Sequence, residues 1–266
     1  MKKTVASLGL LGLMSSFVTL ADSSQPIVKV GLEAYQEKYE ETLDGSRFME
    51  EKARMLGVSG AIRFDLSEKD ALSLEGRWGW GDADYSSASS EHSGLGRSTY
   101  DLRLVYQHDF DVGQQRIIPE IGLGRRRLED KLQEAGFGGY QRESTYQYAT
   151  LGLRSVHALG SEWKVEPKLS YNYLLKGKQV SRLSDINPAA EDLKNNQKHG
   201  YGFELSASFV RELEERKAVS ITPFWRAWRI DDSDTQPIRV SGIVIGSGME
   251  PKNKTDEIGV NVSYHF

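Results

Sequence analysis

Two aspartates separated by one residue form the pattern in this chain that comes closest to a catalytic pair. Asp82 and Asp84 flank Ala83 near the end of a segment in which apolar and polar residues alternate. Carboxylates placed this way can work with an imidazole to activate a water molecule for hydrolysis. An ordinary solvated junction between a strand and a loop contains the same residue types, so the pair alone does not predict an enzyme.

The imidazole that such a site needs has no clear source in the sequence. None of the five histidines has an aspartate two positions before it. His199 is the histidine that we expect near the outer end of a strand, since His92 falls in a loop and His108, His157 and His265 fall low in their segments. The sequence also lacks a Ser/His/Asp set, a phosphate-binding glycine loop and a pair of histidines with metal-ligand spacing.

An acidic run, Asp231, Asp232 and Asp234, offers the carboxylate oxygens that calcium prefers. The rest of an EF-hand-type loop is missing, so a solvated loop is the favoured interpretation. Taking these motifs together, we predict no catalytic, cofactor-binding or metal-binding residues.

The elements that carry these residues begin after an export signal. Lys2 and Lys3 precede an apolar stretch from Val5 to Leu20 that ends on small residues, which is typical of a cleaved signal peptide covering residues 1–21. A transmembrane helix is the alternative, but the stretch is interrupted by serines and short for a span of about 20 residues. No later stretch is apolar enough for a helical span. We therefore expect a mature domain over residues 22–266.

The mature chain alternates apolar and polar residues in long segments, which predicts an all-β fold. In the last segment Ile258, Val260, Val262, Tyr264 and Phe266 share one face. The same test predicts ten strands, an even number as expected for a transmembrane antiparallel up-and-down β-barrel. The predicted strands span 27–40, 53–66, 71–86, 98–112, 116–131, 143–159, 162–182, 198–213, 218–235 and 254–266.

The connections between these strands alternate in length. Short turns near 67–70, 113–115, 160–161 and 214–217 indicate the periplasmic side, and long polar stretches near 41–52, 87–97, 132–142, 183–197 and 236–253 are predicted to be extracellular loops. A soluble β-sandwich would alternate as well. The signal peptide, the aromatic C-terminal residue and this rhythm of turns favour the membrane barrel.

Aromatic and apolar side chains on one face of the strands predict a surface that contacts lipid. This face is expected to include Leu56, Val58, Ile62, Phe64, Leu72, Leu74, Trp78, Trp80, Tyr100, Leu102, Leu104, Tyr106, Phe110, Ile117, Ile121, Leu123, Trp163, Val165, Leu169, Tyr171, Tyr173, Tyr201, Phe203, Leu205 and Phe209. The sixth and ninth strands alternate poorly, and the sequence does not assign a face to Tyr146, Tyr148, Trp225 or Trp228.

The opposite face carries charges of both signs in equal number, which predicts ion pairs across a lumen. Ten strands enclose little more space than side chains can fill. A selective channel would favour one sign of charge, so we predict a largely occluded lumen. The residues expected to face inward are Lys29, Glu33, Glu37, Arg63, Asp65, Glu75, Arg77, Asp101, Arg103, Glu120, Arg126, Arg154, Lys164, Glu166, Lys168, Glu204, Arg226 and Glu257.

Basic residues near the outer ends of two strands suggest a contact with lipopolysaccharide phosphates, although an ordinary solvated rim would look the same. These residues are Arg125, Arg127, Lys176, Lys178 and Arg182. Apolar loop residues, Phe48, Met49, Phe137, Tyr140, Ile243, Val244 and Ile245, indicate either a binding surface or a lid of packed loops. The chain has 34 basic and 38 acidic residues and no cysteine, which gives no reason to expect nucleic acid, disulfides or a thiolate metal site.

The C-terminal sequence Gly-Val-Asn-Val-Ser-Tyr-His-Phe resembles the β-signal of bacterial outer-membrane proteins. That resemblance implies recognition of the strand ending at Phe266 by the barrel-assembly machinery. The segments 138–144, 174–179, 230–234 and 250–255 resemble a poorly characterised proteobacterial group of outer-membrane barrels across nearly the whole mature chain. The Asp82–Asp84 spacing also resembles that of the omptin proteases, but the Asp-x-His pair of that family is absent.

Taken together, the sequence favours an outer-membrane β-barrel of a Gram-negative-type bacterium that acts in surface interaction or envelope integrity through its extracellular loops. The alternatives are a small-solute, porin-like channel and, with less support, an omptin-like protease at the rim. The ligand, the solute or host target and the oligomeric state do not follow from the sequence.

Overall fold

The computed structural model describes residues 25–266 apart from 114, 137 and 214–216. The predicted signal peptide, residues 1–21, lies outside this range. Within it, no helix combines the length and the hydrophobicity needed to cross a membrane.

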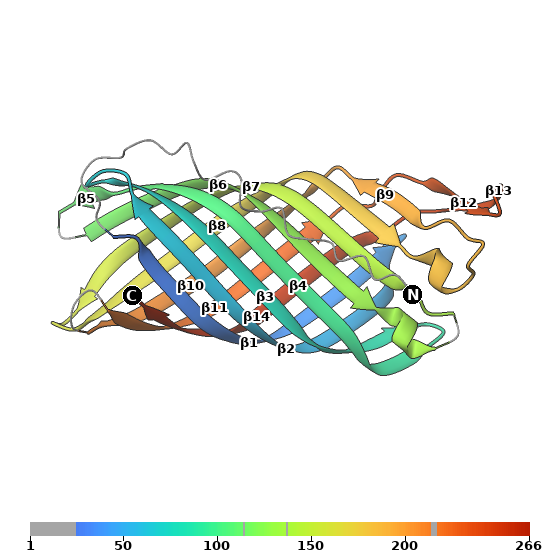
Figure 1. Cartoon of the computed structure of the whole chain (residues 1–266), viewed down its shortest axis with the longest axis horizontal. Coiled ribbons are helices and arrows are strands. Elements are labelled where there is room, and N and C mark those ends of the chain that lie inside the picture. Colours follow the sequence, from blue (N-terminus) through green and yellow to red (C-terminus); the bar gives the residue numbers. More distant parts are fainter. Residues whose placement is uncertain (1–24, 114, 137, 214–216) are drawn as a thin grey trace, which may run out of the picture.

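An antiparallel sheet closes on itself to form the body of the molecule (Figure 1). Strand β10 pairs with β11 on one side and with β8 on the other, and this second pairing closes the barrel. The predicted fold of ten long strands is confirmed. The long strands are β1 (Ile27–Leu43), β2 (Ser46–Asp65), β3 (Asp70–Ser87), β4 (Glu91–His108), β6 (Gln115–Lys131), β7 (Gln141–Leu159), β8 (Trp163–Ser181), β10 (Gly200–Glu212), β11 (Ala218–Ile230) and β14 (Lys252–His265).

Shorter elements lie at the two ends of the barrel. At the periplasmic end, β5 (Phe110–Val112) pairs with β6. At the extracellular end are β9 (Leu193–Gln197), the 3₁₀ turns η1 (Leu132–Ala135) and η2 (Leu183–Asp185), and a separate two-stranded hairpin of β12 (Gln236–Val240) and β13 (Ile243–Gly248). This hairpin extends beyond the other strands at one end of the molecule (Figure 1).

The first and last strands pair along almost their whole length, from Lys29 opposite His265 to Thr42 opposite Lys252. The backbone N–H of Phe266 continues the ladder by donating to the carbonyl oxygen of Val28 at 2.8 Å. The alternating C-terminal segment therefore has the strand structure that its sequence predicts. The start of β1 and the end of β14 lie together at the periplasmic side.

The predicted extracellular loops at 41–52 and 87–97 are wrong, because most of these residues continue the strands. Strand β1 runs to Leu43 and β2 starts at Ser46, joined by a turn in which Asp44 and Gly45 have φ values of 50° and 80°. Strand β3 ends at Ser87 and β4 begins at Glu91. Their polarity predicts loops, yet a strand outside the bilayer can be polar on both faces. The predicted strand 218–235 also ends earlier, at Ile230.

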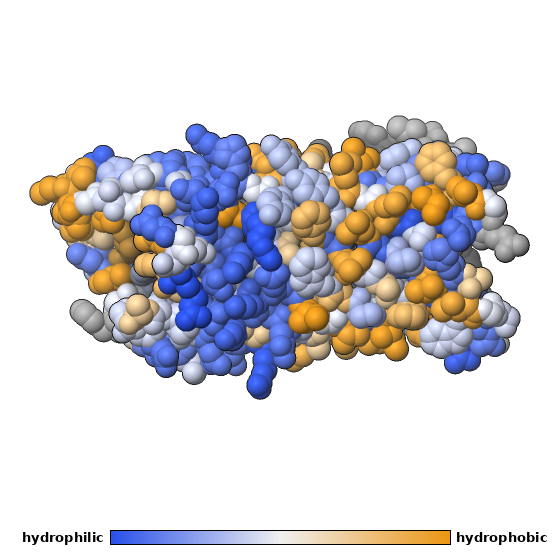
Figure 2. Space-filling view, turned by 180° about the vertical axis from the view of Figure 1, so that it is seen from behind, coloured by the Kyte–Doolittle hydropathy of each residue, from blue (hydrophilic) through white to orange (hydrophobic). Residues whose placement is uncertain are grey.

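A belt of exposed apolar side chains surrounds one part of the barrel wall, and a polar zone separates this part from the hairpin end (Figure 2). On β1 the exposed residues Val30 and Leu32 give way to Gln36 and Lys38 toward the extracellular end. The predicted lipid-facing surface is confirmed on the strands where exposure was expected. The sixth and ninth predicted strands are now assigned as well, since Trp225 is exposed on the outer wall and Tyr146, Tyr148 and Trp228 are buried inside.

The position of the belt can be tested with two substitutions on one strand. Leu32 is 68% exposed on the outer face of β1, and Gln36 lies four residues further toward the extracellular end on the same face. We expect Leu32→Arg to lower the free energy of unfolding by about 2–4 kcal/mol and Gln36→Arg by about 1 kcal/mol or less. Urea unfolding of the barrel in lipid vesicles measures both values. Equal losses of unfolding free energy for the two variants would show that the belt does not end between Leu32 and Gln36.

Candidate functional site: the charged lumen and the outer wall

The centre of the lumen is occupied by a carboxylate surrounded by arginines. Glu257 on β14 contacts Arg126 of β6 at 2.8 Å, Arg77 of β3 at 3.0 Å and Arg226 of β11 at 3.5 Å. The side chains of Glu257 and Arg126 are 0% exposed. Because the strands alternate, every second residue points inward, and the closed sheet brings charges from distant parts of the sequence to one point.

Further ion pairs extend from this centre toward the periplasmic side. Arg103 contacts Glu75 at 2.9 Å and Glu204 at 3.0 Å, which connects three different strands. Nearer the periplasm, Glu120 contacts Arg154 at 3.1 Å and Lys168 at 2.7 Å. These six inward charges, all predicted from the sequence, are therefore paired, as a charge held away from water requires.

The extracellular part of the lumen holds a second cluster that sequence reasoning missed. Arg97 contacts Glu37, Glu51 and Asp130, and Arg142 contacts Asp130 and Glu41. Glu41, Glu51, Arg97 and Arg142 fall in segments that the sequence predicts as loops. A usable signal existed, because the inward alternation of β1 continues without a break past residue 40.

Tyr39 connects this cluster to the hairpin arm. Its hydroxyl donates to Glu41 Oε1 at 2.9 Å and to Glu250 Oε1 at 3.2 Å. Glu250 lies in the connection between β13 and β14. Burial, together with the neighbouring charge of Glu41, raises the pKa of Glu250 well above its usual value. A protonated Glu250 can share these hydrogen bonds without adding a further negative charge to the cluster.

Aromatic side chains fill the lumen beside the charges. Trp228 stacks on Tyr146 with ring centroids 6.1 Å apart and meets the ring of Tyr148 edge-on at 5.1 Å. The guanidinium of Arg126 lies 5.5 Å from the centre of the Trp228 ring. These rings form one buried cluster with Leu174 and neighbouring residues, so apolar packing and ion pairs occupy the same cross-section.

The predicted carboxylate pair does not point into the barrel. Asp82 and Asp84 are exposed and share the outward face of β3 with Trp78 and Trp80, while Ala83 between them is buried. His199 is exposed in a different surface hollow, beside Tyr171, Tyr173 and Tyr201. The structure therefore does not bring these carboxylates and this imidazole together.

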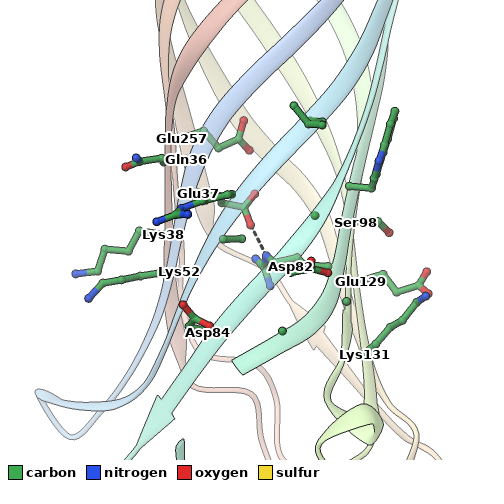
Figure 3. Close-up of a pocket in the computed structure, with 18 of the residues that line it drawn as sticks. Gln36, Glu37, Lys38, Lys52, Asp82, Asp84, Ser98, Glu129, Lys131 and Glu257 are labelled. Carbon is green, nitrogen blue, oxygen red and sulfur yellow. Dashed lines mark hydrogen bonds and ion pairs between the residues drawn. The ribbon is translucent and has the colours of Figure 1, made fainter. Parts of the chain in front are cut away.

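The hollow that contains Asp82 and Asp84 lies on the outer wall. Each inward-facing residue on its lining is flanked along its strand by outward-facing neighbours, as Glu37 is by Gln36 and Lys38. In Figure 3, Lys38 and Lys52 point away from the barrel and Glu37 points into it. Lys38 and Lys52 both pair with Glu50 at 2.8 Å, so these two cations have partners.

On the opposite side of the wall, three exposed cations lie just beyond the apolar belt. By register, Arg125 of β6 and Lys176 of β8 lie on either side of Gln147 of β7, and Lys178 is two residues further along β8. Two residues nearer the membrane on β6 and β7, and three nearer on β8, Leu123, Ala149 and Tyr173 form the corresponding apolar row. Within the part of the chain that the structure describes, none of the three cations has an ion pair.

The other two basic residues predicted at the rim, Arg127 and Arg182, do have ion pairs. Arg127 contacts Glu129 at 3.1 Å and Glu143 at 2.6 Å, and Arg182 lies 3.9 Å from Glu143. The acidic run also has a structural role, because Asp234 accepts hydrogen bonds from the backbone and side chain of Asn196. Among residues 25–266, leaving aside the five undescribed positions, no group of three or more His, Asp or Glu side chains is arranged to hold a metal ion.

A closed barrel with an apolar outer belt and a charged interior defines the class of protein, and comparison with solved structures agrees. The outer-membrane protease OmpT from Escherichia coli matches with a TM-score of 0.66 and 10% identity, over 91% of this chain and 96% of that chain. The translocator domain of the autotransporter NalP from Neisseria meningitidis gives 0.41 and 14%, over 91% and 90%.

No protein-family model and no curated protein sequence matches the chain. At 10% identity the likeness to OmpT shows the fold alone. The chain is therefore an outer-membrane β-barrel protein of the Gram-negative type, and its role has to be argued from its own residues.

Adjacent arginines provide a test of the luminal network. Arg126 points inward to Glu257, whereas Arg127 lies on the outer wall and is partly exposed. Arg126→Ala would leave a buried carboxylate short of a partner, and we expect it to lower the free energy of unfolding by about 3–5 kcal/mol. Arg127→Ala should cost about 1 kcal/mol or less. Urea unfolding in vesicles measures the free energy of unfolding of both variants. Similar losses would contradict a network that excludes water.

Proposed function

We propose that this protein is a sealed barrel whose outer wall and extracellular loops, and not its lumen, carry out its role in surface interaction or envelope integrity. The observation that supports this most directly is the contact of Glu257 with arginines from three other strands at the barrel axis. The small number of strands and the pairing of charges of both signs argue against an open, ion-selective path through the lumen.

The proposal assigns no catalytic function to the barrel. Asp82 and Asp84 face outward beside the tryptophans of β3, and His199 lies in a separate hollow. Hydrolysis would require a base within hydrogen-bond reach of an activated water molecule, and this arrangement does not supply one for that pair.

The proposed partners follow from the outer wall and the last strand. Arg125 and Lys176 lie about two register positions above the apolar row, and Lys178 lies two further. Lipid phosphates are found just outside the apolar belt, so the three cations are free to contact lipopolysaccharide. The strand ending at Phe266, whose ring packs against Tyr264 at 4.8 Å, is the proposed recognition element for the barrel-assembly machinery.

Conductance in a planar bilayer tests the sealed lumen. We expect the refolded protein to show little or no steady current, well below that of a general porin, because charged side chains are paired across its interior. Arg77→Ala or Arg103→Ala should introduce flickering openings by removing cross-lumen partners, whereas Arg127→Ala on the outer wall should not. Large, stable currents from the unmodified protein would overturn the proposal and favour a small-solute channel.

The lipid contact requires a separate measurement. Replacing Arg125, Lys176 and Lys178 by Gln should weaken lipopolysaccharide binding on the order of a hundredfold, since each cation near the surface contributes about 1 kcal/mol. Native mass spectrometry of the refolded barrel titrated with lipopolysaccharide measures the change. The matched control is Lys38→Gln with Lys52→Gln, which removes cations that already pair with Glu50. Equal retention of dephosphorylated lipopolysaccharide would show that the phosphates are not recognised.

A further inference from the structure

The hairpin of β12 and β13 carries the most exposed apolar segment beyond the belt. Ile243, Val244 and Ile245 are 68%, 53% and 64% exposed. Ile243 and Val244 are consecutive strand residues and point to opposite faces, so neither face of β13 is covered at this point. The alternative predicted from the sequence, in which these residues pack together as a lid over the barrel, is therefore wrong for this loop.

The tip of this hairpin is also uncharged. From Val240 to Met249 the sequence contains no acidic or basic residue, although the loops around it contain many. The turn is formed by Ser241 and Gly242, with φ values of 51° and 77°. Residues 240–249 thus present isoleucine, valine, glycine and serine to the surroundings, a composition that tolerates removal from water and offers no charge for a polar partner to recognise.

The base of the hairpin is held firmly by the barrel. The side-chain amide of Asn195 donates to the carbonyl oxygens of Asp234 at 2.7 Å and Gly248 at 3.2 Å. Ser233 and Glu250 exchange two hydrogen bonds, and Glu250 in turn contacts Tyr39 in the lumen wall. The backbone of 189–191 also pairs with the outer edge of β12. The apolar tip is therefore presented in a fixed conformation, which lowers the entropy cost of inserting it.

The tip lies at the end of the molecule that is farther from the apolar belt (Figures 1 and 2). Trp225 is the last apolar residue of the belt on β11, and about ten strand residues separate its level from the tip of β12. With strands tilted by about 40°, this corresponds to roughly 25 Å. Insertion into the barrel's own bilayer is out of reach, so any lipid that the tip enters belongs to an opposing membrane.

We propose that the β12–β13 tip inserts into an apposed phospholipid bilayer and so attaches the barrel to a second membrane. The inference extends the proposed surface role and does not depend on the lumen. A bilayer fits better than a folded partner, because it surrounds an element that is apolar on both faces, whereas strand addition would cover only the free edge of β13. The lack of charge predicts that insertion depends little on the charge of the lipid headgroups.

Fluorescence can locate the tip directly, because the chain has no cysteine and one introduced thiol can be labelled uniquely. The probe is an environment-sensitive dye on Ile245→Cys, with the barrel held in amphipol and mixed with phosphatidylcholine vesicles. We expect its emission to shift to the blue when vesicles are added. The same dye on Ser89→Cys, in the exposed turn between β3 and β4, should show no shift. No shift at position 245 would overturn the proposal.

Vesicle flotation measures the energetic contribution of the tip. Ile243→Ser combined with Ile245→Ser should reduce the bound fraction at least about tenfold, in both zwitterionic and anionic vesicles. Phe48→Ser is the control, since Phe48 is 50% exposed on the separate hairpin of β1 and β2 and should leave binding unchanged. Heat-modifiable migration confirms that each variant is folded.

Three results would refute insertion: no binding to either vesicle type, binding that the isoleucine substitutions leave intact, or self-association without vesicles that these substitutions abolish. The last result would identify a second copy of the chain as the partner of the tip. Conductance of the lumen would contradict only the sealed-barrel proposal, so failures of the two proposals can be told apart.

Discussion

Every backbone N–H and C=O group within the apolar belt needs a partner from the protein, because lipid supplies none and each unpaired group costs several kcal/mol. The chain meets this requirement by pairing β8 with β10 and β1 with β14, which leaves no free sheet edge in the belt. Once the sheet is closed, alternation separates the residues into an outer and an inner population. The distribution of charge in the molecule follows from that separation.

The inner population explains why so many charges are retained in a membrane protein. A ten-stranded barrel is too narrow to give each carboxylate and guanidinium its own hydration shell, so the charges stabilise one another in pairs. Glu257 meets three arginines at the centre, and Glu120 meets Arg154 and Lys168 toward the periplasm. Breaking one pair leaves its partner buried, which makes the network costly to disturb and argues against a conducting path.

Beyond the bilayer the constraints on the wall relax. Strands β1 and β2 continue past the belt with polar residues on both faces, and their inner face holds the Arg97 and Arg142 cluster. The same cluster, through Tyr39 and Glu250, fixes the base of the β12–β13 hairpin. The extracellular extension therefore works as a rigid support, and it carries an apolar tip well away from the membrane below.

The likeness to OmpT is a likeness of fold alone. The two barrels superpose with a TM-score of 0.66. In this chain, however, Asp82 and Asp84 lie on the outer wall with Trp78 and Trp80. The alternation of the strand contains this direction, since residues 78, 80, 82 and 84 share one face of β3.

The sequence by itself determined the strands, the belt and the inward charges, because a period of two is a local property that side chains display wherever the strand lies. The polarity of residues 41–52 predicts a loop, but most of them belong to β1 and β2. The sequence does not show where along a strand the bilayer ends. The partners of the charges were decided only by the tertiary structure. Arg126 and Glu257 are 131 positions apart, and only closure and register bring them together.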